Sequence, residues 1–194
     1  MPAETILRPE DIGSVAVIGT GSVGASWASL FLAHGMTVVA HDPAPGAEER
    51  ARDFVAKAWP ALLDLGVAKT DRPALQALRF VASAAEAARS ADLIQENIPE
   101  KPDLKARLLA EIDAAATPDK IILSSTGGIP PTALQASCTH PERLVVVHPF
   151  NPSHLIPLVE VVGGRHTDPA VVDWAIAFAR MLGKHPIRLN VEAN

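Results

Sequence analysis

The sequence predicts an α/β fold in which helices cover both faces of a mostly parallel sheet of about eight strands. Short apolar runs rich in β-branched residues alternate along the chain with segments whose apolar residues recur three and four positions apart. The runs are typical of buried parallel strands, and the periodic segments are typical of helices that pack on them. The first run, 15–18, leads directly into Gly19, Gly21 and Gly24 in the spacing G-x-G-x-x-G. This strand, glycine turn and helix predict a doubly wound sheet of the Rossmann type.

The other strands and helices follow from their own patterns. The helix after the glycine turn spans 22–34, and Gly35 is placed to end it. A second helix is expected over 46–65, where Pro60 should kink or divide it. The remaining predicted strands are 37–40, 78–81, 92–95, 120–123, 144–147, 157–162 and 185–189, and the remaining predicted helices are 84–89, 104–115, 130–137 and 169–181.

The glycine turn and an acidic residue after the second strand together predict a dinucleotide site. Glycines at these positions allow a tight turn, close approach to a pyrophosphate and close packing of the helix, whose free N–H groups receive the phosphate charge. Asp42 follows Gly24 by 18 positions, near the spacing at which a carboxylate binds a ribose 2′-hydroxyl, although alone it would be a turn cap. Residues 43–46 offer no Lys or Arg for a 2′-phosphate, so we predict NAD rather than NADP. The predicted cofactor residues here are Gly19, Thr20, Gly21, Ser22, Val23, Gly24 and Asp42.

Composition excludes several classes of partner. The 194 residues carry 17 Lys plus Arg against 22 Asp plus Glu, a formal charge of −5, with no basic block that would bind nucleic acid or an anionic membrane. No apolar run approaches the ~20 residues of a membrane span, and residues 1–11 do not resemble a secretion leader. Cys138 is the single cysteine, which excludes an intrachain disulfide and a Cys-based metal cluster. We therefore expect a cytoplasmic protein without a metal site, with Cys138 as a buried structural thiol.

A histidine and a glutamate near the end of the chain are the predicted catalytic pair. Ligands bind beyond the carboxyl ends of the strands in such sheets, which directs attention to 96–100, 124–128 and 148–151. His148 ends an apolar strand, and Glu160 lies within another, where burial without a partner is costly. If the loop between them folds back, Glu160 can hold one imidazole nitrogen, fix the tautomer and favour the imidazolium. Considered alone, His148 would more often be a capping or packing residue.

Four stretches resemble the NAD-binding domain of the L-3-hydroxyacyl-CoA dehydrogenase family, and they span nearly the whole chain. They are the glycine turn, Gln95-Glu96-Asn97-Ile98-Pro99-Glu100, His148-Pro149-Phe150-Asn151-Pro152 and Pro157-Leu158-Val159-Glu160-Val161-Val162. The spacing of the histidine and the glutamate is far more specific than the glycines. Within the family, the branch that holds L-carnitine dehydrogenase and the gulonate dehydrogenase also known as lambda-crystallin looks nearest.

The resemblance implies NAD-dependent oxidation of a 3-hydroxyl to a 3-oxo group, in fatty acid or carnitine metabolism. His148 would be the general base, Glu160 would orient it, and Asn151 would contact the nicotinamide ribose or the substrate. Glu100 and Lys105 would lie along the cofactor, or else form the solvated start of a helix.

The turn that should bind the substrate departs from the family pattern. The family usually has a serine after the threonine of this turn, and Gly127 stands there instead. Ser124, Ser125 or Thr126 replaces that serine, or the site is weakened. The predicted substrate residues are Ser125, Thr126 and Gly127.

The resemblance also sets the domain expectations. Residues 1–190 would form the NAD-binding domain, and 191–194 would begin a C-terminal helical domain that supplies a catalytic asparagine and most of a homodimer interface. We therefore expect the chain to be truncated.

Three interpretations of the substrate and activity remain open. Acyl-CoA enzymes of the family carry a lysine-rich helix after the second strand, and here Lys57 stands nearly alone, which favours a small 3-hydroxy acid of the carnitine or gulonate type over a 3-hydroxyacyl-CoA. Trp59 and Phe150 are available for an aromatic cage around a quaternary ammonium, whereas Trp27 is predicted in the core. The rival from another class is a cofactor-binding structural protein with little turnover. Gly127 favours that rival, and the pair of His148 and Glu160 favours the enzyme.

Overall fold

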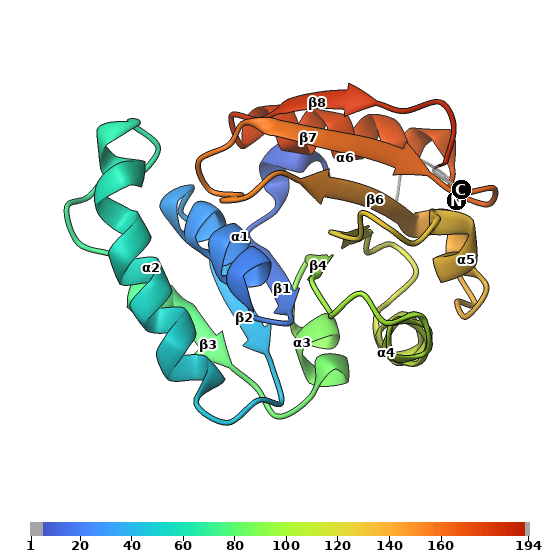
Figure 1. The fold of residues 1–194 in the computed structure, drawn as a ribbon, viewed down its shortest axis with the longest axis horizontal. Coiled ribbons are helices and arrows are strands. Elements are labelled where there is room, and N and C mark those ends of the chain that lie inside the picture. Colours follow the sequence, from blue (N-terminus) through green and yellow to red (C-terminus); the bar gives the residue numbers. More distant parts are fainter. Residues whose placement is uncertain (1–5, 193–194) are drawn as a thin grey trace.

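Residues 6–192 are described by a computed structural model, in which eight strands form one sheet in the order β3-β2-β1-β4-β5-β6-β7-β8 (Figure 1). Strand β7 runs antiparallel to β6, β8 runs parallel to β7, and the other neighbours are parallel. The mostly parallel sheet is confirmed. The strands are β1 Ser14–Ile18, β2 Thr37–His41, β3 Leu78–Phe80, β4 Leu93–Glu96, β5 Ile122–Ser124, β6 Leu144–Pro149, β7 Leu158–Gly163 and β8 His185–Arg188.

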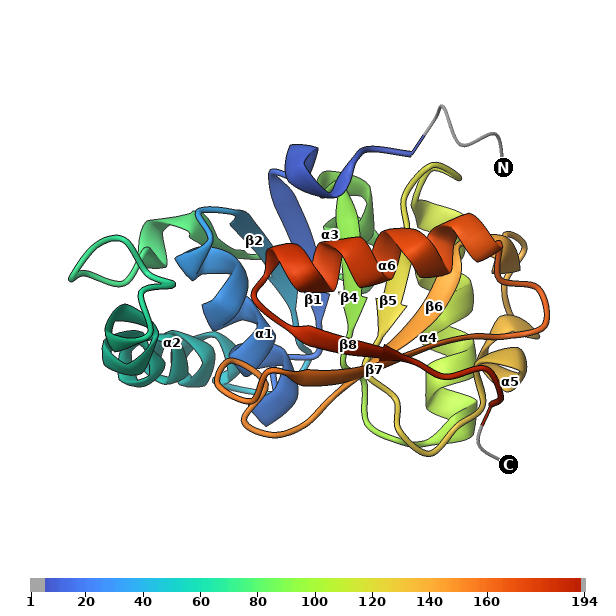
Figure 2. The same cartoon turned by 90° about the horizontal axis from the view of Figure 1, so that it is seen from above.

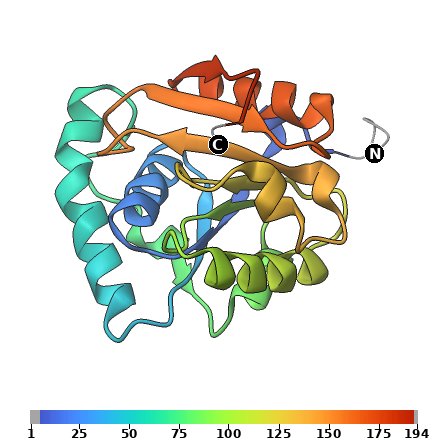
Figure 3. The same ribbon diagram turned by 45° about the vertical axis from the view of Figure 1, so that its right-hand side comes forward.

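Helices cover both faces of this sheet, as the doubly wound prediction requires. One face packs on α1, α2 and α6, and the other packs on α3, α4 and α5 (Figures 2 and 3). The α-helices are α1 Ser22–Ala33, α2 Ala47–Asp64, α3 Ala84–Ser90, α4 Pro102–Ala115, α5 Pro131–Gln135 and α6 Pro169–Met181, with short 3₁₀ turns at Pro9–Asp11, Leu75–Ala77 and Pro141–Arg143.

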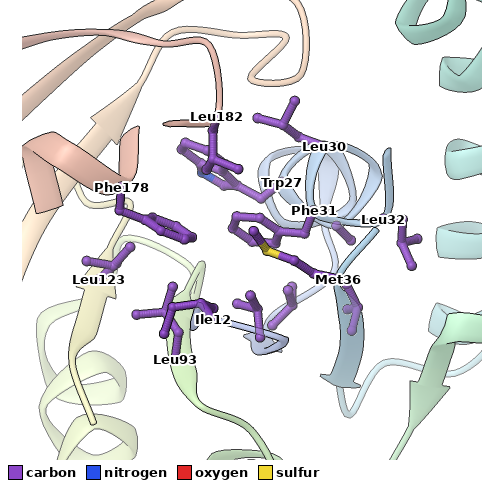
Figure 4. Close-up of a cluster of buried hydrophobic side chains, with 14 of the residues drawn as sticks. Ile12, Trp27, Leu30, Phe31, Leu32, Met36, Leu93, Leu123, Phe178 and Leu182 are labelled. Atoms are coloured by element: carbon purple, nitrogen blue, oxygen red, sulfur yellow. The ribbon is translucent and has the colours of Figure 1, made fainter. Parts of the chain in front are cut away.

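Alternation along each strand divides the core into two layers. Val15 and Val17 of β1 pack in the cluster with α1 and α6, whereas Ala16 and Ile18 pack in the cluster with α3 and α4. In the first layer the Trp27 ring stacks on Phe31 at 5.6 Å between ring centroids, and it is buried as predicted (Figure 4).

Of the two alternatives predicted at Pro60, a kink or a division of the helix, the division is excluded, because α2 continues through the proline. Val55, Ala58 and Leu62 anchor the helix in the core on both sides of Pro60, while Pro60 itself is exposed, where water can satisfy the carbonyl that loses its partner. Cys138 is only partly buried, although burial and the nearby Asp113 charge still raise the pKa of its thiol to about 11.

The end of the described chain lies against the sheet domain. Thr132, at the start of α5, donates from its backbone N–H to the Glu192 carboxylate at 2.8 Å, and its hydroxyl donates to the same carboxylate. Of the segment predicted to begin a helical domain, 193–194 lie outside the described residues. None of the helices within residues 6–192 is both long and apolar enough to cross a bilayer.

Candidate active site

The glycine turn between β1 and α1 is shaped by close backbone contacts. Gly19 has a φ of +84°, and a Cβ there would lie 2.6 Å from the Asn97 carbonyl oxygen. A Cβ on Gly24 would overlap the Gly19 carbonyl, whereas one on Gly21 would meet no described atom within 4 Å. Gly19 and Gly24 are thus required by the protein itself, and Gly21 leaves its surface open to a ligand.

The start of α1 is available to an anion. Gly21 is the N-cap residue, and no side chain of residues 6–192 caps this helix end. The N–H groups of the first turn, which include those of Ser22 and Val23, therefore keep their capacity to bind phosphate oxygens.

Asp42 connects the end of β2 to the glycine turn. Its carboxylate accepts from the Thr20 backbone N–H at 2.7 Å and from the Thr20 hydroxyl at 3.1 Å, and its other oxygen accepts from the Ala44 N–H at 2.9 Å. A carboxylate has about four acceptor positions, so a ribose hydroxyl can still bind. Asp42 and the glycine turn share a cavity of about 490 Å³. Its other lining residues include His41, Pro43, Ala44, Asn97, Ile98, Pro99, Leu104 and Leu108.

Glu100 and Lys105 meet in a second cavity of about 230 Å³, which shares Val23 and Asn97 with the first. The Lys105 side chain is 1% exposed, and its Nζ lies 2.7 Å from the Glu96 carboxylate and 3.5 Å from that of Glu100. Partial burial raises the pKa of Glu100, but hydrogen bonds from Thr126 and Gly128 and the Lys105 charge outweigh it, so the pKa is lowered overall. Glu100 is therefore ionised in this cavity.

The expectation that Glu96 follows its strand and faces the ligand is wrong. Glu96 lies inside β4 and is fully buried, and its carboxylate accepts from Lys105 and from the Ser124 hydroxyl. The buried ammonium offsets the cost of burying this carboxylate, which makes the pair a structural support beneath the second cavity.

The three hydroxyls before Gly127 already have acceptors within the protein. Ser124 donates to Glu96, and Thr126 donates to Glu100. Ser125 donates to Asn97 Oδ1 at 2.8 Å, and its oxygen lies 2.9 Å from Gln95 Nε2 and 3.1 Å from Trp27 Nε1. Each hydroxyl thus holds two segments of the site together.

His148 and Glu160 lie directly opposite each other on the antiparallel strands β6 and β7. His148 Nδ1 lies 3.0 Å from Glu160 Oε2, and the two side chains are 32% and 35% exposed. Because Nδ1 donates to the carboxylate, Nε2 is left as the basic nitrogen. His148, Glu160 and Gly127 line a third cavity of about 60 Å³. The predicted pair therefore forms, beside the turn that carries Gly127.

Gly127 packs against the imidazole. A Cβ on Gly127 would lie 2.5 Å from His148 Nε2, closer than real Cβ atoms approach another heavy atom. A serine at this position would therefore displace the ring or the turn. The absence of a side chain at Gly127 therefore leaves room for the His148 ring in its present position. The sequence did not show this contact.

The proposed aromatic cage does not form. Trp59 is buried and donates from its indole nitrogen to the Thr70 carbonyl at 2.8 Å, in a different cavity at the far end of α1. Phe150 does lie beside His148, with 5.5 Å between ring centroids. Asn151 follows it in an exposed loop, and the Asn151–Pro152 peptide is cis.

Sequence reasoning gave no role to several residues of the site. Asn97 was only one of the residues 96–100 expected beyond a strand end, yet it lies against both Gly19 and Gly24 and lines both cavities. Leu104 and Leu108 form an apolar wall of the first cavity one helical turn apart. Their periodicity predicted a buried helix face and could not show that part of this face meets a ligand.

An open helix N-terminus beside Asp42 and the cavity that they share are the features of an NAD-binding domain. The comparisons agree. Residues 14–192 match the family "3-hydroxyacyl-CoA dehydrogenase, NAD binding domain", and the chain belongs to that family.

Its relatives include L-carnitine dehydrogenases. That of Pseudomonas sp is 50% identical over 181 residues, which are 93% of this chain and 56% of the relative. That of Streptomyces griseus is 50% identical over 184 residues, 95% of this chain and 54% of the relative. The chain thus spans about half the length of these relatives.

Solved structures agree on fold and family. A 5-formyl-3-hydroxy-2-methylpyridine 4-carboxylic acid 5-dehydrogenase superposes with a TM-score of 0.84 at 38% identity, over 92% of this chain and 58% of that one. The 3-hydroxybutyryl-CoA dehydrogenase of Escherichia coli superposes with a TM-score of 0.83 at 31% identity, over 92% and 38%.

Proposed function

We propose that the complete gene product oxidises the 3-hydroxyl of a small 3-hydroxy acid to a 3-oxo group, with NAD as acceptor. The observation that carries this proposal is the His148–Glu160 pair, 3.0 Å apart, beside cavities that fit a dinucleotide. The residues present suit NAD: the N-terminus of α1 for the pyrophosphate, Asp42 for a ribose hydroxyl, and Glu100 and Lys105 toward the nicotinamide end. By the family resemblance, Asn151 would contact the nicotinamide ribose or the substrate.

His148 acts as the general base. Bound NAD⁺ supplies the acceptor for the hydride that leaves C3 of the substrate. His148 Nε2 takes the hydroxyl proton as the C–O bond becomes a carbonyl, so that one hydride and one proton leave the alcohol. Glu160 keeps the Nδ1–H tautomer in place and stabilises the imidazolium that results.

Asp42 selects NAD. Its carboxylate can accept from a 2′-hydroxyl, and it would repel the charge of a 2′-phosphate. Equal affinity for NAD and NADP in a titration of the purified chain would remove Asp42 from the cofactor site.

A small acid is favoured over a CoA ester by the surface of α2. Lys57 is exposed there, but Arg52 is engaged by Glu48 and by the carbonyls of Leu75 and Leu78. This leaves few free cations for the phosphates of CoA, and the relatives named L-carnitine dehydrogenase point the same way. A 3-hydroxyacyl-CoA is the second candidate, which the match to the family favours.

The decisive experiment compares substrates in the complete gene product. NADH formation is followed with L-carnitine, L-gulonate and (S)-3-hydroxybutyryl-CoA, and we expect kcat/KM to be highest for a small acid. A preference for the CoA ester would overturn the substrate assignment. NAD binding without turnover on any of the three would favour the structural role instead. Two further parts of the proposal have their own tests. Light scattering of the purified complete gene product tests homodimerisation, and fractionation of cells that express it tests a cytoplasmic location.

A further inference from the structure

The loop 150–157 joins β6 to β7 and carries Asn151, three positions after His148. Its middle is buried although it has no regular secondary structure: Ser153 is fully buried and His154 is 8% exposed, between the exposed Phe150 and Leu155. Buried loop residues such as these must find partners for their polar groups. The partners of this loop come from α1 and from the residue before β8.

The first attachment is a serine of α1. Ser26 Oγ accepts from the His154 backbone N–H at 2.8 Å and lies 2.7 Å from His154 Nδ1. The hydroxyl proton is free to go to Nδ1, which requires a neutral ring. Burial and then the Lys184 charge lower the pKa of His154, in agreement with that assignment.

The second attachment is a buried ammonium. Lys184 is 6% exposed, and its Nζ donates to the Ser153 carbonyl and, at 2.9 Å, to the Ile156 carbonyl. The Nζ also lies 5.4 Å from the centroid of the Trp27 ring. No ion pair among residues 6–192 includes Lys184, so its charge is satisfied by the loop carbonyls and an aromatic face rather than by a carboxylate. The ammonium is well solvated only while the loop stays in this place.

Both attachments end on one helix. Ser26 and Trp27 are adjacent on α1, whose first turn faces the pyrophosphate position, and the Trp27 indole lies against Ser125 of the substrate turn. We propose that Lys184 is a positioning residue that, together with the Ser26–His154 pair, fixes loop 150–157 on α1 and so holds Asn151 toward the nicotinamide end of the cofactor. The inference rests on the proposed function, because it assumes that NAD occupies the site.

The test separates the two ends of the cofactor. ADP occupies only the glycine turn and the Asp42 cavity, whereas NAD also reaches the loop. In Lys184→Met we expect NAD to bind about tenfold more weakly, the order of one lost hydrogen bond, while ADP affinity is unchanged. Lys69→Met is the matched control, because Lys69 is exposed and donates to a single carbonyl, that of Gly66. It should bind both ligands as the original chain does.

The two attachments of loop 150–157, Lys184 to its carbonyls and Ser26 to His154, are together called the clamp. Ser26→Ala removes the second attachment and should give the same selective loss of NAD affinity if Lys184→Met does not fold. Equal loss of NAD and ADP affinity in a folded variant would show that Lys184 merely supports the domain, and unchanged affinity for both would show that the loop needs no clamp. Either result overturns the inference. Failure of the original chain to bind NAD at all would instead refute the proposed function.

Discussion

The proposed cofactor half of the site, around Gly19 and Gly24, and the proposed catalytic half, around His148 and Glu160, differ in the kind of atoms that form them. Around Gly19 and Gly24 the site is formed by backbone atoms, and its shape depends on the absence of a Cβ atom at these two positions. Around His148 and Glu160 it is made of side chains that meet across two antiparallel strands. The first half should be damaged by adding atoms, and the second by removing them. Gly127 is an exception: it lies beside His148, but a side chain added there, rather than one removed, should disturb the site.

The largest effect is expected from removing the base. His148→Gln in the complete gene product should lower the oxidation rate by about 10²- to 10⁴-fold, the usual range for a lost general base, and should leave NAD affinity nearly unchanged. Steady-state kinetics and isothermal titration measure the two quantities separately.

His140→Gln is the matched control, because His140 also lies near a glutamate, with its Nδ1 3.5 Å from Glu142, but it precedes the start of β6, whereas His148 lies near the end of that strand. It should keep full activity. A large loss of NAD affinity in His148→Gln would mean that the two halves are not separable.

The next effect comes from adding one methyl group to the cofactor half. Gly24→Ala should weaken NAD binding by about 10- to 100-fold and lower the free energy of unfolding by about 1–3 kcal/mol, because the methyl group overlaps the Gly19 carbonyl. Gly21→Ala is the comparison: it should weaken NAD binding but leave the unfolding free energy within ~0.5 kcal/mol, since no described atom is near. Urea unfolding and NAD titration of both variants check this. Equal stability losses would show that Gly21 also serves the fold.

A smaller loss of oxidation rate is expected from a substitution at Gly127. Gly127→Ala should lower the oxidation rate roughly tenfold by displacing the imidazole from Glu160. Gly128→Ala, one position on, places its methyl group 3.4 Å from the Glu100 carboxylate, a wider approach than the 2.5 Å between a Gly127 Cβ and His148 Nε2, and should lower the rate less. The His148 ring signals in an NMR spectrum should move in the first variant only. If both variants behave alike, the contact between Gly127 and His148 has no consequence for the reaction.

The smallest effect concerns pH and the clamp. Burial lowers the pKa of Lys184 to about 8, from 10.5 in the unfolded chain, so between these values the unfolded state binds more protons and the free energy of unfolding rises with pH. The neighbouring His154 and His34 also have lowered pKa values and are neutral in this window. We expect a rise on the order of 1 kcal/mol from pH 8 to pH 10, because bonds to two carbonyls offset part of the burial. Lys184→Met should lack this rise; a rise of the same size there would assign it to other groups.

Most of the fold was predictable because buried parallel strands are apolar runs and their helices are periodic. The end of β6 was not, since it extends to Pro149 only by pairing with β7. In the site, the spacing of the glycines and Asp42 predicts the cofactor half by itself, whereas the pairing of His148 with Glu160 was predicted only on the condition that the loop between them folds back, which the strand pairing of β6 and β7 achieves. The clamp had no signal in the sequence, because Ser26 and His154 lie 128 positions apart and meet only in the folded chain.

His148 and Glu160 occupy facing positions in the register of β6 and β7. A slip of one residue between these strands would turn every side chain of β7 to the opposite face, carrying the Glu160 carboxylate into the apolar layer beneath α6 and bringing the apolar side chain of a neighbouring residue opposite His148. A molecule with this strand slip should therefore be inactive. In a preparation of the complete gene product, active-site titration should then count only molecules in which β6 and β7 have the native register.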